Sequence, residues 1–271
     1  MASEKKTSHN PELKELEKKR PDFDSEKPVV VSKSPNTNWK LGDGAYDDEW
    51  KKYKKISVSA YSDTRPPINN YKLLISAIIP RPIGFISTLS KDGKRNLAPF
   101  SFFNVANVEP PAFVISITAS KGMKDTLANI LETGELTVNI ISEWFLEAAN
   151  FASIDAPPHI DEWELSGLTP AKSEDVQPPH VAESAFSAEA KLVHHHEWKS
   201  KVDQRKPSGF TVLVEATRFH IREDLTNEDF SSVDLAKLKP VSRLGGISYG
   251  RTTDTCEVIR PEFAKHVPRN D

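Results

Sequence analysis

One stretch, Asn96–Asn104, has the residue types of a binding surface for a flat heteroaromatic ring with polar edges. Ser101 and Asn104 supply hydroxyl and amide groups, and Phe100, Phe102 and Phe103 supply aromatic surface. Pro99 has no amide hydrogen, so we expect an edge or bulged strand here, with irregular backbone whose amides can point at a ligand. Ordinary core packing explains the phenylalanines equally well.

A second stretch, Ser120–Thr126, precedes an amphipathic segment and combines two lysines with the hydroxyl of Thr126. Backbone amides at a helix N-terminus favour a bound anion such as phosphate, and Lys121 and Lys124 add positive charge. A simple helix cap with solvated lysines explains the same residues equally well. A ring site and a phosphate site in one chain together suggest a mononucleotide cofactor.

The elements that must position these residues are short strands with few helices. Two apolar, β-branched or aromatic runs, 83–89 and 96–104, flank an Asp92-Gly93 turn, which predicts a β-hairpin. Further strands are predicted at 113–118, 136–141, 186–196 and 210–221, and short helices at 124–133, ending at Gly134, and at 143–152, capped by Ser142. This order predicts an antiparallel sheet closed into a barrel with peripheral helices, with an irregular connection over 155–180.

Two further motifs receive less support. In a strand His194 and His196 share one face, but no carboxylate or cysteine lies at a compatible spacing, so exposed strand histidines are favoured and no metal site is predicted. The run from Gly246 to Gly250 matches G-x-S-x-G, yet the βαβ scaffold and the downstream partners of a nucleophile elbow are missing. A hydrolase that uses Ser248 is therefore a disfavoured alternative.

Cys256 is the only cysteine, which excludes an intramolecular disulfide and suits a reducing compartment. We expect it to be a buried structural thiol. Neither a P-loop nor a G-x-G-x-x-G motif occurs, so a cofactor must be held in another way.

The composition fits one barrel domain preceded by a charged arm. The chain has 271 residues and a formal net charge of -3, which argues against wholesale nucleic-acid binding, and no apolar run is long enough to span a membrane. Residues 1–55 hold 13 basic and 11 acidic side chains, so we expect a disordered arm over 1–55 and a folded domain over 56–271. The arm aromatics Trp39, Tyr46, Trp50 and Tyr53 are expected to pack on the surface of the body, which is favoured over a binding function.

Several runs together resemble the flavin reductase-like, FMN-binding split-barrel family, in its flavoprotein oxygenase branch. They are RPIGFISTLSKDGKRNLAPFSFFN, KDTLANILETGELTVNI, LVHHHEW, EATRFHIRED and VDLAKLKPVSRLGGISYGR, in the family's order, between about Tyr61 and Arg260. The resemblance implies a six-stranded antiparallel split β-barrel, a homodimer, and FMN near the subunit interface.

The resemblance also implies roles for particular residues. The ring of FMN would lie against the stretch that contains Asn96, Ala98, Pro99, Phe100, Ser101, Phe102 and Asn104, with Ser87 and Thr88 near its ribityl or phosphate end. Lys124, Asp125 and Thr126 would hold the phosphate, and Arg243 would lie near the flavin or the dimer contact. No catalytic side chain is implied, and His196 is a candidate contact on the nicotinamide side.

The function expected from these observations is a cytoplasmic, NAD(P)H-dependent flavin reductase that passes hydride to FMN. The alternative is an FMN-binding electron carrier or flavin-binding protein without its own NAD(P)H activity. Small-molecule flavin and nicotinamide are the expected partners, an oxygenase partner is unknown, and neither nucleic acid nor membrane is expected.

Overall fold

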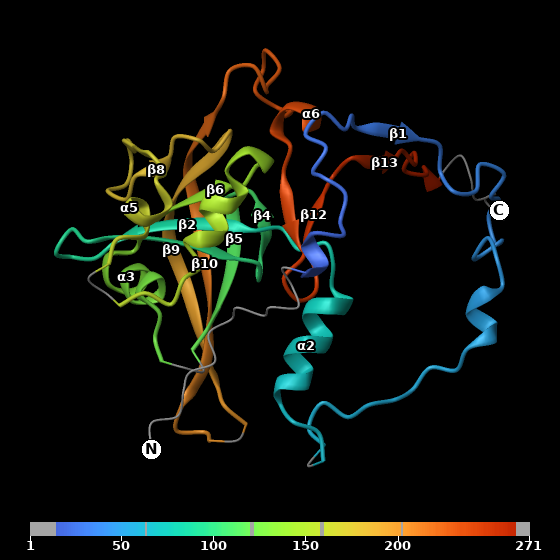
Figure 1. Cartoon of the computed structure of the whole chain (residues 1–271), viewed down its shortest axis with the longest axis horizontal. Helices are drawn as coiled ribbons and strands as arrows, with labels where there is room; N and C mark the ends of the chain where they lie inside the picture. Colours follow the sequence, from blue (N-terminus) through green and yellow to red (C-terminus); the bar gives the residue numbers. More distant parts are fainter. Residues whose placement is uncertain (1–14, 63, 120–121, 158–159, 202, 264–271) are drawn as a thin grey trace.

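One seven-stranded antiparallel sheet dominates the computed structural model, which describes residues 15–62, 64–119, 122–157, 160–201 and 203–263 (Figure 1). The strand order is β3-β2-β6-β9-β10-β5-β4. The bounds are β2 Gly84–Leu89, β3 Arg95–Phe100, β4 Phe103–Val108, β5 Pro111–Thr118, β6 Glu135–Ile140, β9 Phe186–Lys199 and β10 Pro207–Ile221. The predicted mainly β antiparallel fold is confirmed, with seven strands in this sheet where six were expected.

The sheet curls around a single apolar core. Strands β3 and β4 stand at the two ends of the strand order but follow one another in the chain, and the amide of Ser116 in β5 donates to the carbonyl of Phe102 between them at 2.7 Å. All seven strands contribute buried side chains to one cluster, for example Ile86, Phe103 and Val212. Period-two alternation therefore points one row of each strand inward.

The predicted β2–β3 hairpin is confirmed, but its second run is broken. Gly93 in the turn has φ 77°, a left-handed conformation that suits glycine. The stretch predicted as one strand over 96–104 divides into β3, ending at Phe100, and β4, starting at Phe103. Gly84 permits this fold-back, because a Cβ at that position would come within 2.8 Å of the Phe103 ring.

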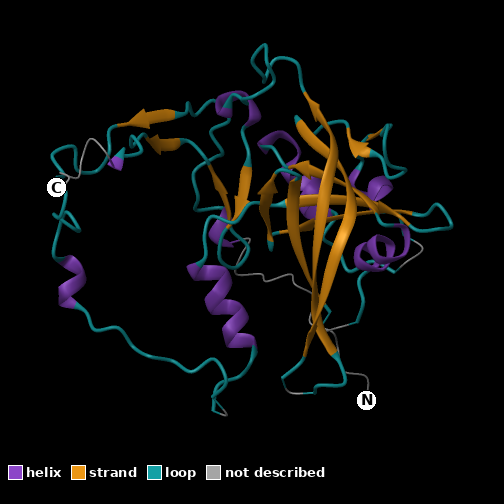
Figure 2. Cartoon of the chain, turned by 180° about the vertical axis from the view of Figure 1, so that it is seen from behind, coloured by secondary structure: helices purple, strands orange, loops and turns teal. Residues whose placement is uncertain are grey.

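The helices are short and lie outside the barrel, as Figure 2 shows. They are α2 Ile68–Ala77, α3 Asp125–Thr133, α4 Leu146–Phe151, α5 Glu162–Ser166 and α6 Leu235–Leu238, with 3-10 helices at Glu49–Lys52 (η1) and Glu143–Phe145 (η2). Helix α3 ends at Gly134 with φ 72°, as predicted. Helices α2, α5 and α6 were not predicted.

The second predicted helix is confirmed only in outline. It consists of η2 followed by α4, and Ser142 gives it no side-chain cap, because the Ser142 hydroxyl is buried without a partner among the described residues. A second apolar cluster, which contains Phe85, Leu97, Phe145 and Trp163, packs α4 and α5 against the outer face of β2 and β3. This cluster fixes α5 beside the β3 edge.

The remaining strands are small. They are β1 Val30–Ser32 with β13 Asp254–Cys256, which pair in parallel, β7 Pro170–Ala171 with β8 His180–Val181, and β11 Val241–Arg243 with β12 Tyr249–Arg251. Cys256 is exposed, so the prediction of a buried thiol is wrong. The reason is that β1 and β13 form a ribbon outside both apolar clusters.

The arm aromatics do not pack on the body as predicted. Trp39, Tyr46, Trp50 and Tyr53 are 50%, 70%, 64% and 78% exposed. The segment that carries them follows β1 and runs apart from the barrel before the chain returns at α2, as both cartoon views show (Figures 1 and 2). No helix within the described ranges is long and apolar enough to cross a membrane.

Candidate functional site

A cavity of about 650 Å³ lies where β3, β5, α2 and the start of α3 meet. Such a volume is within the usual range for small-molecule sites. Its wall brings together most of the residues that the sequence singled out. They are Asn96, Ala98, Pro99, Phe100, Ser101 and Phe102 from the ring stretch, and Lys124, Asp125 and Thr126 from the phosphate stretch.

The ring stretch forms one wall because of its position in the sheet. Strand β3 is at the end of the strand order, as the proline at position 99 predicted. The β2–β3 register ends at Phe100 and the β4–β5 register begins at Phe103, so Ser101 and Phe102 lie between the two ladders. This short irregular link faces the cavity and combines an apolar surface with a hydroxyl group.

The start of α3 forms the polar end. Asn96 Nδ2 donates to the Thr126 hydroxyl at 2.9 Å, and one turn later Asn129 Nδ2 donates to the Thr88 hydroxyl at 3.0 Å. These two bonds fasten α3 to β3 and β2. The Thr126 hydroxyl oxygen accepts a hydrogen bond from Asn96. The hydroxyl hydrogen of Thr126 is not used in that bond and can be donated to a ligand.

Lys124 supplies the positive charge at this end. It is exposed, precedes the first helical residue of α3, and is the one cation among the described residues of the cavity wall. Ser120 and Lys121, also predicted for the phosphate site, lie outside the described residues. The polar end therefore offers one ammonium group, one hydroxyl and the first amides of a nine-residue helix.

Glu162 is a cavity residue that sequence reasoning missed. It is 8% exposed, and its carboxylate accepts from the Leu97 amide at 3.3 Å. Burial raises the pKa of Glu162 above its ordinary value, and the neighbouring carboxylates of Asp125 and Asp161 act in the same direction. The residue falls in a stretch read as irregular, where Asp161 caps α5 by accepting from the Trp163 amide at 2.9 Å.

Arg95 holds that cap in place. Its Nε and Nη2 atoms lie 2.9 and 2.5 Å from Asp161 Oδ2. A capping aspartate before an acidic first turn was the sequence signal that could have revealed α5. Its contact with the β3 edge depends on tertiary packing, which the local sequence does not specify.

Arg81 is a second residue that sequence reasoning missed. Its guanidinium is buried and donates to the carbonyls of Ile75, Ile78 and Leu244 at 2.5, 3.0 and 3.1 Å, and to the Ser101 hydroxyl at 3.3 Å. Burial and the nearby Arg243 lower the pKa of Arg81. Arg81 therefore ties the end of α2 to the irregular link at Ser101.

The other predicted site residues lie outside the cavity wall. The Thr88 hydroxyl accepts a hydrogen bond from Asn129 of α3. Ser87 is fully buried, and its hydroxyl has no hydrogen-bond partner among the described residues. The Asn104 side chain accepts from the Val105 amide at 2.8 Å on exposed β4. Arg243 stacks over the Tyr249 ring at 4.5 Å in the β11–β12 hairpin.

The two disfavoured motifs have simple surroundings. All three histidines of β9 are exposed, and His196 contacts Trp198 edge-on with ring centroids 4.6 Å apart. Ser248 lies in the tight turn between β11 and β12, and strand β12 follows it directly. A nucleophile elbow needs a helix at that position, so the structure removes the context for a hydrolase.

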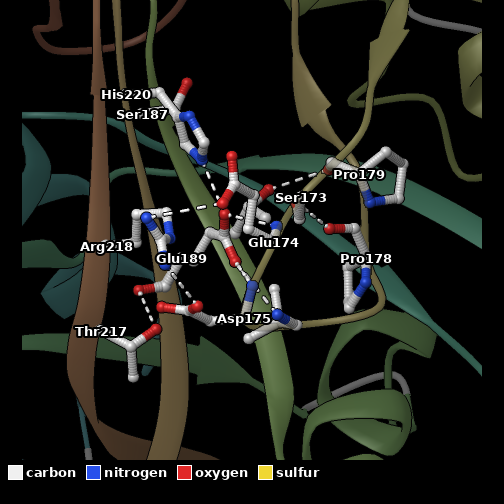
Figure 3. Close-up of polar contacts among 12 residues, drawn as sticks. Ser173, Glu174, Asp175, Pro178, Pro179, Ser187, Glu189, Thr217, Arg218 and His220 are labelled. Atoms are coloured by element: carbon white, nitrogen blue, oxygen red, sulfur yellow. Dashed lines mark hydrogen bonds and ion pairs between the residues drawn. The ribbon is translucent and has the colours of Figure 1, made fainter.

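A second polar cluster, centred on Glu189, is closed to ligands (Figure 3). The Glu189 carboxylate is fully buried and accepts from the amides of Glu174, Asp175 and Val176 at 2.8, 2.5 and 3.0 Å. His220 Nε2 lies 2.7 Å from the same carboxylate. Both carboxylate oxygens thus bind the chain's own groups, and the cluster fastens the connection after α5 to β9 and β10.

Comparison with known proteins identifies the family of this chain. A family model for the flavin reductase like domain matches residues 76–233. An uncharacterised protein of Aquifex aeolicus is 37% identical over 190 residues, which cover 69% of this chain and 92% of the relative.

Two solved structures support the same assignment. Nitrilotriacetate monooxygenase component B from Bacillus cereus is 32% identical with a TM-score of 0.70, and the match covers 76% of this chain and all of that one, 100%. A Shewanella frigidimarina protein with a split barrel domain matches in fold alone, at 22% identity and a TM-score of 0.61 over 74% of this chain and 94% of that one. The chain belongs to the flavin reductase-like family of split-barrel proteins.

Proposed function

We propose that the cavity binds FMN and that the protein is an NAD(P)H-dependent flavin reductase acting as a homodimer. The single observation that carries this proposal is the cavity wall, where the ring stretch and the phosphate stretch meet although they lie on different elements. Family membership supports a flavin ligand. The individual cofactor contacts are part of the proposal.

The chemistry of the donor set fits FMN. Ala98, Pro99, Phe100 and Phe102 offer an apolar surface for an aromatic ring, and Ser101 offers a hydroxyl at its edge. At the other end Lys124, Thr126 and the first amides of α3 suit a phosphate dianion. Asp125 and Glu162 would oppose that anion if both were ionised, and burial, which raises the pKa of Glu162, favours the neutral form of that carboxyl.

When bound, FMN would supply a ring system that accepts hydride from NAD(P)H. The chain's own contribution is positioning and electrostatics. Lys124 and Thr126 hold the anionic end, Asn96 orients the Thr126 hydroxyl, and Arg81 orients Ser101 beside the ring surface. No side chain is assigned as a general acid or base.

A second copy of the chain is part of this proposal. Helix α2 borders the cavity through Tyr71 and Ile75, yet Leu73, Leu74 and Ile78 on or just after it are 52%, 54% and 61% exposed. Apolar side chains on one helix at such exposure indicate an interface. A dimer that covers α2 would also cover one side of the cavity.

The Bacillus cereus structure is a component of a monooxygenase by its name, which suggests a use for the product. We propose that reduced flavin made here is passed to a separate oxygenase.

An FMN-binding carrier without NAD(P)H activity is the second candidate. The observation that favours it is the place of His196, the suggested nicotinamide contact, which is exposed on β9 and not on the cavity wall. A carrier needs the flavin site alone.

Anaerobic mixing of the FMN-loaded protein with NADH or NADPH separates the two functions. The reductase predicts loss of the oxidised flavin absorbance at a rate that saturates with NAD(P)H concentration. Flavin that stays oxidised with both nucleotides, but is bleached by dithionite, would leave only the carrier. A protein that fails to bind FMN at all would contradict both.

A further inference from the structure

The segment from Asn36 to Tyr61, called the arm loop here, is anchored at both ends. Before it, β1 pairs with β13, and Arg251 donates to the Asp24 carbonyl at 2.7 Å while its guanidinium lies 4.3 Å from the Phe23 ring centroid. At its other end, Asn70 Nδ2 of α2 donates to the carbonyl of Ala60, near the end of the arm loop, at 2.7 Å. The arm loop therefore leaves and rejoins the body at fixed places.

Between these anchors the arm loop stands away from its own barrel. Every residue from 37 to 61 is exposed. Within the described chain the hydrogen bonds and ion pairs of residues 36–59 are local, such as Trp39 Nε1 to the Gly44 carbonyl at 2.9 Å and Lys51 with Asp48 at 2.7 Å. Figures 1 and 2 show the same separation from two opposite sides.

The exposed side chains of the arm loop are the types that anchor protein interfaces. Trp50 is 64% exposed, Tyr53 78%, Ile56 87% and Tyr61 75%. Tryptophan and tyrosine contribute most often to the binding energy of protein–protein contacts. The segment is thus held at both ends while these side chains pack little against the described part of the chain.

Two elements of the body, α2 and β4, also expose apolar side chains. Helix α2 buries Ile75 but exposes Leu73 and Leu74, and on β4 Val105 and Val108 are 62% and 83% exposed. The described part of one chain thus exposes apolar side chains both on the arm loop and on the body. Two-fold symmetry lets each copy cover the other's surface with its own, so that both are satisfied at once.

The arm and the rest of the chain differ in the sign of their net charge. Residues 1–55 carry 13 basic and 11 acidic side chains, whereas the remaining residues carry 23 and 28. The arm is thus net positive and the body net negative. Lys51, Lys52, Lys54 and Lys55 lie among the arm-loop aromatics.

We propose that the arm loop of each copy packs its aromatic side chains against α2 and the β4 surface of a second copy, so that two arms clasp the homodimer reciprocally. This inference rests on the homodimer in the proposed function and extends it, because residues outside the family domain then hold the two copies together.

Cross-linking of full chains tests the contact directly. Unlabelled and heavy-nitrogen-labelled protein are mixed, allowed to exchange copies, and treated with a lysine-reactive cross-linker. The inference predicts links between an arm lysine, Lys54 or Lys55, and Lys72 of α2 that join one heavy and one light peptide. Links that are all heavy or all light would show that the arm folds onto its own body and would overturn the inference.

A matched pair of full-length variants provides the second readout. Trp50→Ala with Tyr53→Ala removes two arm anchors, and Phe230→Ala, 72% exposed on another loop, is the control. We expect the arm variant to raise the dimer dissociation constant by about 30-fold or more, and the control to leave it unchanged. Equal dissociation constants would overturn the inference and leave the arm for a different partner.

The flavin absorbance of the same samples keeps the two proposals apart. Bound FMN without mixed heavy–light links counts against the arm loop alone. Mixed links in a protein that binds no FMN count against the flavin proposal alone. A wild-type chain that stays monomeric at high concentration overturns the homodimer and the arm-loop clasp together.

Discussion

Two buried glutamates separate a structural polar cluster from the polar end of the cavity. Glu189 is 0% exposed and Glu162 is 8% exposed, so both carboxyls have lost most of their contact with water. Burial would raise the pKa of Glu189, but the hydrogen bonds from three backbone amides and His220 outweigh it, and the pKa is lowered. At Glu162 burial dominates, and the pKa is raised.

The difference lies in what each region leaves available. Around Glu189 both carboxylate oxygens are bound by the chain itself (Figure 3). Around the cavity Lys124 and the Thr126 hydroxyl face a space large enough for a ligand. Burial and polarity alone therefore do not identify a functional site. Polar groups that remain available in a cavity are the better sign.

Glu189→Ala should have the largest effect, on stability alone. It leaves the amides of Glu174, Asp175 and Val176 without their buried acceptor, which should cost about 3–5 kcal/mol. Urea unfolding followed by circular dichroism measures the loss, and exposed Glu223→Ala should stay within about 0.5 kcal/mol of wild type. FMN affinity of the folded fraction should not change.

The pH dependence has a defined sign. Because the folded pKa of Glu189 is lowered, its contribution to stability is present above the unfolded pKa of about 4.3 and is lost as the pH falls through the folded pKa. If Glu189→Ala had the same unfolding free energy at neutral pH as the Glu223→Ala control, the cluster around Glu189 would not stabilise the fold.

Lys124→Ala should do the reverse of Glu189→Ala, weakening FMN binding and leaving stability nearly unchanged. It removes the cation of the cavity wall, and a charge-assisted contact with phosphate should make FMN binding about 10- to 100-fold weaker, with little loss of stability. Fluorescence titration with FMN measures the affinity. Lys94→Ala, on the exposed β2–β3 turn, is the control for loss of one charge. Equal affinities for the two variants would remove Lys124 from the site.

Substitution of Thr126 should affect both stability and FMN affinity, because Thr126 joins β3 to α3 and also lines the cavity. Thr126→Val keeps the shape, deprives Asn96 Nδ2 of its acceptor and removes the donor, so we expect a loss of about 1 kcal/mol in stability and about tenfold in FMN affinity. Thr126→Ser should restore most of both. A valine variant with wild-type affinity would limit Thr126 to a structural role.

Glu162→Gln should have the smallest effect, a change in the slope of stability against pH. Because the folded pKa of Glu162 is raised, wild-type stability falls as the pH rises from the unfolded pKa through the folded one. The glutamine keeps an acceptor for the Leu97 amide and removes this fall. Melting temperatures between acid and neutral pH measure it. Parallel profiles for the two proteins would show that Glu162 titrates normally.

Local sequence signals predicted the elements that local chemistry determines. The Asp-Gly turn and the glycine after α3 were correct because each demands a left-handed backbone. Proline at position 99 correctly indicated the end of the sheet. The ring and phosphate stretches were singled out in the same way, from residue type, and the structure brings most of their residues to one cavity wall.

What depends on tertiary packing was missed. Helix α2 was not predicted, and most of its apolar side chains are exposed, which only the whole fold shows. Glu162 joins the cavity because Trp163 packs α5 beneath β3, a contact between residues far apart in sequence. The thiol of Cys256 is exposed because its strand pairs with the arm and not with the barrel.

Titration of the wild-type protein with FMN tests the central claim most directly. The account predicts saturable binding of one FMN per chain, with quenched flavin fluorescence, that Lys124→Ala weakens and Glu189→Gln leaves unchanged. Absence of saturable FMN binding by the folded wild-type protein would contradict it.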